Sequence, residues 1–355
     1  MHRRLAAGVG RAPGSMATKA TGARVATSVD AVGIARIRHT RTMSSPRPAS
    51  SATLARGLGW GMLGVTAFSF TVPLTHIAVE ALPPVFVGAG RAVVAAVLAV
   101  IALVVTRQRR PSARQGARLA VVAAGVVVGF PMLTSLALTS ASASHGAVVI
   151  AVLPAATAVA AVVRGRERPS RSFWIAAALG AVAAIAFAAL NGGAFAPLQG
   201  SDLLLLAAVV AAAIGYAEGG MLARELGSWQ TVSWALVLAS PLMIVLTAGS
   251  AWAAAPVSAP PEAWLSLAYL SVVSMFLGFF AWYRGLAIGP MAQVSQVQLV
   301  QPVLTLAWAA LILHEHITAL TVIGGLAVIA CAGIAVRTRA RPSGGRRDER
   351  RPAAG

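Results

Sequence analysis

Residues 143–170 read ASHGAVVIAVLPAATAVAAVVRGRERPS, and residues 289–318 read GPMAQVSQVQLVQPVLTLAWAALILHEHIT. Each stretch predicts an apolar helix with a proline near its middle, followed by a glutamate and then by a hydroxyl residue at the N-cap position of the next helix. The two stretches align when the chain is shifted by 148 residues, which indicates an internal repeat. The residues matched at this shift are Leu138 and Leu286, Pro154 and Pro302, Glu167 and Glu315, and Ser170 and Thr318.

The composition around these stretches is that of a membrane protein. Of the 355 residues, 57% are hydrophobic and 11% are charged, whereas soluble chains carry roughly a quarter charged residues. The net charge of +19 comes from arginines in tails and short loops, and the chain has no groove-reading motif. We therefore expect a lipid bilayer as a partner and no nucleic acid.

The apolar residues form blocks of about 20, the length that a helix needs to cross a bilayer. The sequence predicts an all-α polytopic protein of ten transmembrane helices, at 57–79, 84–106, 115–139, 143–163, 171–191, 202–223, 229–248, 262–285, 289–312 and 318–336. These blocks define a first repeat at 57–191 and a second at 202–337, between basic tails at 1–56 and 338–355. Because each repeat has an odd number of helices, the two repeats are predicted to be inverted in the membrane.

The orientation is predicted from the lysines and arginines, which collect in cytoplasmic loops. One group precedes the first block, and another follows residue 336. Between them, arginines lie at 107–118, at 164–171, at Arg224 and at Arg284. The five loops on the other side contain none. Both termini are therefore expected in the cytoplasm, and the protein in the bacterial cytoplasmic membrane.

The two quoted stretches resemble the paired signature of the drug/metabolite transporter superfamily, in its ten-helix EamA-like branch. Residues 282–286 (WYRGL) and 87–91 (VGAGR) are similar to other positions of that pattern, and the resemblance covers 57–337. The glycine-glutamate pair usual in the family is replaced here by Arg166-Glu167 and His314-Glu315. The resemblance implies ten helices around a central cavity that opens alternately to each side. It implies a secondary transporter, with export of an amino acid, a related metabolite or a drug as the expected activity.

Polar residues within the blocks are the candidate substrate-binding residues. At about 100° per residue, four side chains of block 289–312 share an arc of roughly 80°. They either line the cavity or hydrogen-bond to neighbouring helices, and we favour the cavity. Three residues of block 262–285 share one face and are expected to line the same cavity. The candidates are Gln298, Gln301, Thr305 and Trp308, then Ser271, Ser274 and Trp282, with Tyr216 in block 202–223.

Four ionisable residues lie within or beside the predicted helices. Arg91 lies about 10 Å below the outer surface. It either holds an anionic group in the cavity or serves as a strut, paired with Glu80 or with backbone carbonyls. His76 and Glu80 share one helix face and form either a proton-coupling pair or two solvated groups. Glu218 is expected to reach water at the cytoplasmic edge.

Other functions are disfavoured by what the sequence lacks. We expect no cofactor and no metal, because His314-Glu315-His316 does not have the spacing of a helical zinc site. The single cysteine, Cys331, cannot form an internal disulfide. An intramembrane lipid-modifying enzyme, or a receptor or scaffold, remains the alternative to a transporter. Proton or sodium coupling, and a monomer or homodimer, are both compatible with the sequence.

The first 42 residues are rich in arginine, alanine, serine and threonine, and they contain one acid, Asp30. This composition is similar to that of an organellar transit peptide. A translation start near Met43 is the second interpretation, because Met43-Ser44-Ser45-Pro46 would start a compact protein directly, and we favour it on composition alone.

Overall fold

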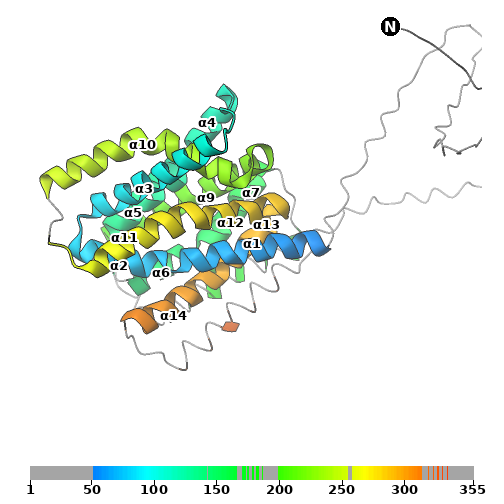
Figure 1. Cartoon of the computed structure of the whole chain (residues 1–355). Coiled ribbons are helices and arrows are strands. Elements are labelled where there is room, and N and C mark those ends of the chain that lie inside the picture. The colour runs from blue at the N-terminus through cyan, green and yellow to red at the C-terminus, as the bar shows by residue number, and fades with distance from the viewer. Residues whose placement is uncertain are drawn as a thin grey trace, which may run out of the picture. The chain divides into compact units, whose positions relative to one another are not determined.

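The structure is a computed structural model that describes residues 51–313 with gaps at 142, 166–169, 173, 176–177, 180, 184–185, 187–198 and 255–257. Six further positions, 319, 323, 326, 327, 330 and 334, are also described. The described residues form helices connected by short turns, with no β-strand among them, so the all-α prediction is confirmed (Figure 1). The predicted tails lie outside these residues.

The first repeat begins with two consecutive helices, α1 and α2, which are separated at Phe70. Further along, α4 continues into a π-helical segment, η1, and then into α5. The described elements of this repeat are α1 (Ser51–Ser69), α2 (Thr71–Ala81), α3 (Pro84–Val105), α4 (Ala113–Val122), the π-helical η1 (Ala123–Gly129), α5 (Phe130–Ala137), α6 (Ala143–Ile150) and α7 (Leu153–Gly165). The side chain of Ser112 caps α4 by accepting from the backbone of Gln115, which fixes the start of that helix.

The second repeat has the same order of elements. They are α9 (Gly200–Leu226), α10 (Ser228–Ala253), α11 (Pro261–Tyr269), the π-helical η2 (Leu270–Leu277), α12 (Gly278–Ile288), α13 (Met291–Ser295), the 3₁₀-helical η3 (Gln296–Val300) and α14 (Gln301–Leu313).

The element boundaries repeat at the 148-residue shift that the sequence predicted. The starts of α4, α6 and α7 correspond to the starts of α11, α13 and α14, and the ends of α3 and α7 correspond to the ends of α10 and α14. Even the two π-helical segments, η1 and η2, occupy equivalent places. The internal repeat is therefore present in the helices themselves.

The two repeats pack against each other reciprocally. Helix α3 packs along its counterpart α10, and α1 packs along α12 just as η1 and α5 pack along α9 (Figure 1). In the same way α7 contacts α9, while η3 and α14 contact α1. This exchange of equivalent neighbours is the packing expected of two repeats related by a pseudo-two-fold axis.

Seven helices of the described part are long and apolar enough to span a membrane. They correspond to seven of the ten predicted blocks, which supports the two-repeat membrane architecture. Block 143–163 contains the shorter apolar helix Leu153–Arg164, and blocks 171–191 and 318–336 lie largely outside the described residues. The count of ten stays a prediction.

Prolines interrupt two of the predicted blocks. Block 143–163 is divided into α6 and α7 just before Pro154, and block 289–312 passes through the 3₁₀ segment η3 just before Pro302. A proline has no amide hydrogen for the carbonyl four residues earlier, and its ring displaces that carbonyl. The sequence predicts such a local opening at Pro302, where the proline frees the carbonyl of Gln298, and the structure has an interruption at both prolines.

Glycines allow two close helix crossings. A Cβ at Gly285 would lie 2.7 Å from the amide nitrogen of Gly61 and 2.8 Å from the carbonyl oxygen of Gly57, at the crossing of α1 and α12. A Cβ at Gly215 would lie 3.3 Å from the amide nitrogen of Val126, at the crossing of α9 and η1. At both crossings the glycines let the helix backbones approach closely.

Arginines from several helices gather at one end of the helices. The carboxylate of Glu218 on α9 bonds to Arg118 on α4 and to Arg164 on α7. Arg224, also on α9, donates to the carbonyl of Gly289 at 3.1 Å, just beyond the last turn of α12. The expectation that Glu218 reaches water was wrong: its side chain is 2% exposed, because two guanidinium groups replace the water.

Candidate functional site

Two pockets lie side by side among the described helices and share two lining residues, Val72 and Gln301. The larger has a volume of about 420 Å³ and the smaller about 260 Å³. Both are lined by residues of both repeats. Gln301, the first residue of α14, is the polar side chain common to them.

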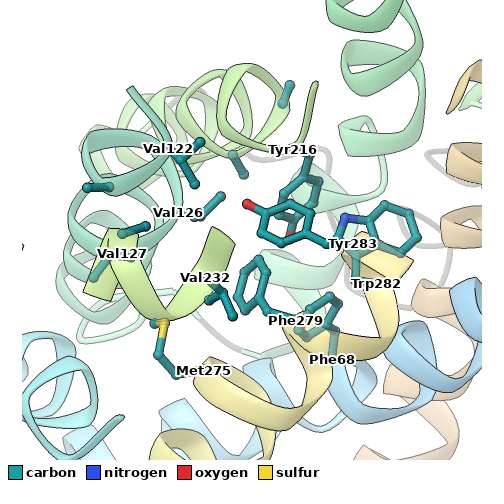
Figure 2. Close-up of a cluster of buried hydrophobic side chains, with 14 of the residues drawn as sticks. Phe68, Val122, Val126, Val127, Tyr216, Val232, Met275, Phe279, Trp282 and Tyr283 are labelled. Carbon is teal, nitrogen blue, oxygen red and sulfur yellow. The ribbon is translucent and has the colours of Figure 1, made fainter. Parts of the chain in front are cut away.

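The larger pocket combines an apolar wall with a small number of polar groups. Its apolar lining comes mainly from α1, η1 and the η2–α12 region, and Figure 2 shows most of these side chains around Tyr216. The two π-helical segments each contribute to this wall, η1 through Val126 and η2 through Met275. The lining consists of Phe68, Thr71, Val72, Arg91, Val126, Phe130, Tyr216, Ser274, Met275, Phe279 and Gln301.

Aromatic rings make this wall rigid. Phe68 stacks on Tyr216 with an angle of 9° between the ring planes, and Phe279 packs against Phe68 at a centroid distance of 4.9 Å. Trp282 supports Tyr216 from outside the lining, at 5.5 Å, and is fully buried. Phe68, Tyr216 and Phe279 thus form one cluster of mutually packed rings in the lining.

A hydrogen bond joins two polar residues of the lining. The hydroxyls of Thr71 on α2 and Ser274 on η2 are 2.8 Å apart, and both side chains are buried. Ser271, one turn earlier on η2, instead donates to the carbonyl of Leu267 at 2.7 Å and does not line either pocket. The structure thus places Ser274 at the pocket and Ser271 against its own helix.

Arg91 of α3 reaches the larger pocket and is 1% exposed. Its Nε and Nη2 have no hydrogen-bond partner among the described residues. The pairing with Glu80 that the sequence allowed is not found, because the Glu80 carboxylate bonds to His76 and is 64% exposed. Of the two interpretations, the geometry brings Arg91 to the cavity.

The smaller pocket is polar on one side only. Gln298, Gln301 and Thr305 come from the second repeat, while the first repeat contributes apolar residues such as Ile150 and Leu153. Gln298 is 1% exposed, and neither its Oε1 nor its Nε2 has a partner among the described residues. A buried amide with two unsatisfied groups is costly unless a ligand or water binds it.

The other two members of the predicted arc make helix contacts. The hydroxyl of Thr305 donates to the carbonyl of Ser69 at 2.9 Å, and the indole of Trp308 donates to the Ser69 hydroxyl at 2.8 Å. Trp308 also stacks on Phe70, at 4.3 Å between centroids. Thr305 still lines the smaller pocket, whereas Trp308 lines neither.

His76 and Glu80 share a face of α2, as the spacing predicted. The His76 Nε2 lies 3.3 Å from the Glu80 Oε1, and the two side chains are 26% and 64% exposed. The pair sits at the end of α2 away from the arginine-rich end and lines neither pocket.

Several lining residues were absent from the sequence-based candidates, namely Phe68, Thr71, Val126, Phe130, Met275 and Phe279. Phe68 and Thr71 are one turn apart, and Met275 and Phe279 flank the face that carries Ser274. An analysis of the helix faces that neighbour the candidate residues would have found these four. Among the described residues, no group of three or more His, Cys, Asp or Glu side chains could hold a metal ion.

Comparisons with known proteins agree with this architecture. Residues 55–189 and 199–337 each match the EamA-like transporter family. The chain is 46% identical over 284 residues to the protein named "Uncharacterized transporter YdeK" of Bacillus subtilis (strain 168), which covers 79% of this chain and 97% of that relative. A protein of known crystal structure shares the fold with a TM-score of 0.62 at 15% identity, over 81% of this chain and 97% of that one.

Proposed function

Because the chain belongs to the EamA-like transporter family and is a multi-pass membrane transporter, we propose that it exports a small metabolite or drug across the cytoplasmic membrane by alternating access. The substrate binds in the two joined pockets between the repeats. An apolar wall with a few polar groups, as in the larger pocket, is typical of small-molecule sites.

One observation carries this proposal: buried polar groups without partners face a pocket at the junction of two repeats. Gln298, whose side-chain amide has no hydrogen-bond partner among the described residues, lines the smaller pocket, and Gln301 lines both pockets. Substrate sites of inverted-repeat transporters lie at such a junction, near the middle of the membrane. A bound polar ligand would supply the hydrogen bonds that the Gln298 amide lacks within the described protein.

The pocket chemistry favours transport over the alternative, an intramembrane enzyme. The polar lining of the larger pocket consists of one arginine, one tyrosine, one glutamine and two hydroxyls that bond to each other. An acyl-transfer or hydrolytic site needs a nucleophile beside a base. No histidine or carboxylate of the described chain lines either pocket.

Direction and coupling are part of the same proposal. Arginines collect at the end of the helices where Arg118, Arg164 and Glu218 meet, and this end is assigned to the cytoplasm by the positive-inside rule. The His76–Glu80 pair then lies toward the outside. This pair, a histidine beside a carboxylate on one helix face, is the candidate for proton coupling.

The deciding experiment compares glutamine-to-leucine variants of the same segment. Leucine keeps helix propensity and lipid solubility and deletes the amide. For Gln301→Leu we expect transport per molecule of folded protein to fall at least about tenfold, or its specificity to change, because a site built for a polar group rejects a mismatch strongly. Substrates for the assay come from comparing metabolites retained and excreted by cells that lack or overproduce the protein.

Gln296→Leu is the matched control. Gln296 is buried on the neighbouring segment η3, but it lines neither pocket. Its replacement should cost only about 0.6 kcal/mol of stability, the average for a polar group between membrane helices. Equal transport per molecule by wild type and Gln301→Leu, across the substrate panel, would remove the pockets from the proposal.

A further inference from the structure

The larger pocket contains the guanidinium group of Arg91, and no acidic side chain among the described residues pairs with it. We propose that the larger pocket binds a small organic monocarboxylate, with the carboxylate on Arg91 and the apolar body of the molecule against the aromatic wall. This inference rests on the proposed transport function and adds the chemical class of the ligand.

The unpaired atoms of Arg91 define the geometry of the ligand. Nε and Nη2, the two nitrogens without partners, form one edge of the planar guanidinium group. Their N–H bonds on that edge are parallel, and they match the two oxygens of a carboxylate in a bidentate pair. A single carbonyl or water oxygen would satisfy the edge only in part. The vacant donors therefore select a group with two coplanar acceptors.

The charge of Arg91 is equally unpaired. Among the described acids, Glu80 bonds to His76, Glu218 and Glu225 bond to Arg118, and Asp202 caps the start of α9. The fifth, Glu262, is on the exposed surface at the start of α11. A charged group inside a membrane protein is costly unless it pairs. An anionic ligand would supply the pair.

The remaining lining favours a monocarboxylate over a phosphate or an amine. No lysine or second arginine lines the pocket, so the two charges of a phosphate would be only half compensated. No acid lines it either, so an ammonium group would find no counter-ion there. Phe68, Phe279 and Met275 offer the apolar surface that the body of the ligand needs, as Figure 2 shows.

The test uses the purified full-length protein in detergent and measures its thermal unfolding midpoint. The probes are benzoate, 3-phenylpropionate and hexanoate, each beside its neutral amide, together with 3-phenylpropylamine. Sodium chloride and sodium phosphate at equal ionic strength are included. We expect at least one carboxylate to raise the midpoint by roughly 2–4 °C at saturation, while its amide, the amine and the inorganic salts do not.

Two substitutions connect this effect to Arg91. Arg91→Gln removes the charge and should weaken carboxylate binding at least about 30-fold. Arg91→Lys keeps the charge but loses the planar edge, and should weaken binding by an intermediate factor. The control is Arg109→Gln, since Arg109 is exposed beyond the end of α3 and should bind as wild type does.

The proposal is overturned if no carboxylate stabilises the wild type, if the amides stabilise it equally, or if Arg91→Gln responds as the wild type does. An equal response to chloride or phosphate would mean that Arg91 holds an inorganic counter-ion only. None of these results affects the transport function, which is tested by transport per molecule in Gln301→Leu. Conversely, if the protein bound a carboxylate but transported nothing, the proposed transport function would be wrong and the carboxylate site would still be supported.

Discussion

At the residue scale, prolines free backbone carbonyls that side chains then use as hydrogen-bond acceptors. Pro73 has no amide hydrogen for the carbonyl of Ser69, four residues earlier, and that oxygen accepts from Thr305 on α14 instead. Pro241 similarly frees the carbonyl of Val237, which accepts from the hydroxyl of Ser240 at 2.8 Å. In the absence of water, such groups must be satisfied within the protein, and the first of these bonds joins α1 to α14.

At the arginine-rich end, replacing Glu218 should lower the free energy of unfolding more than replacing any other residue there. Its buried carboxylate joins α4, α7 and α9 through Arg118 and Arg164. In Glu218→Gln both guanidinium groups lose a charged partner, and we expect a loss of about 1.5–3 kcal/mol in the free energy of unfolding. The measurement is the unfolding midpoint of purified protein in detergent.

Glu225→Gln is the matched control for that variant. Glu225 bonds to the same Arg118, but its side chain is 46% exposed, against 2% for Glu218. An exposed ion pair contributes less than about 1 kcal/mol, so this change should be nearly silent. If the two variants lowered the midpoint equally, burial of Glu218 would not be what gives its ion pairs their strength.

At the element scale, the same helix order in the two repeats gives different surfaces. Glycines lie on both sides of the two equivalent crossings: Gly57, Gly61 and Gly285 where α1 meets α12, and Gly125 and Gly215 where η1 meets α9. The π-helical segments η1 and η2 hold equivalent positions, yet only η2 presents a hydroxyl to the larger pocket. A widened turn is common at functional sites because it re-aims side chains.

The glycine crossing gives a prediction with an internal control. In Gly285→Ala the new Cβ would lie 2.7 Å from the backbone nitrogen of Gly61, so α1 and α12 must separate. We expect this to destabilise the protein by roughly 1–3 kcal/mol. Gly59→Ala, on the exposed side of α1 with nothing within 4 Å of the new Cβ, should be neutral or stabilising by about 0.5–1 kcal/mol. The unfolding midpoints of both variants test this prediction. An unchanged midpoint for Gly285→Ala would show that the crossing of α1 and α12 tolerates a wider spacing.

At the scale of the whole molecule, the reciprocal packing of the repeats and the one-sided arginines together predict the topology. In a Cys331→Ala background, single cysteines in predicted outer loops should react with an impermeant thiol reagent added to intact cells. Cysteines in predicted cytoplasmic loops should react only after the membrane is opened. The outer positions are Gly192, Pro256 and Ala319, and the cytoplasmic positions are Ser112 and Ser170. Labelling of Pro256 from the inside only would contradict the inverted ten-helix arrangement.

The sequence by itself determined the membrane class, the helical architecture and the repeat. These properties depend on local quantities: the length of apolar blocks, the spacing of prolines and glycines, and the side on which arginines fall. The 148-residue shift predicted from a few matched residues recurs in the boundaries of the helices. The family resemblance, carried by the same stretches, is confirmed over both repeats.

Only the tertiary structure decided which polar side chains are paired. Thr305 and Trp308 lie in the same sequence arc as Gln298 and Gln301, yet both bond to Ser69, more than 230 residues away in the chain. Glu218 finds its arginines 54 and 100 residues away, while Arg91 finds no acid among the described residues. Pairing depends on the distance between atoms in the folded chain. The spacing of residues along the sequence does not determine that distance. The free energy of a buried polar group depends on that pairing, and for this reason the unpaired Arg91 and Gln298 became identifiable only once the helices were packed.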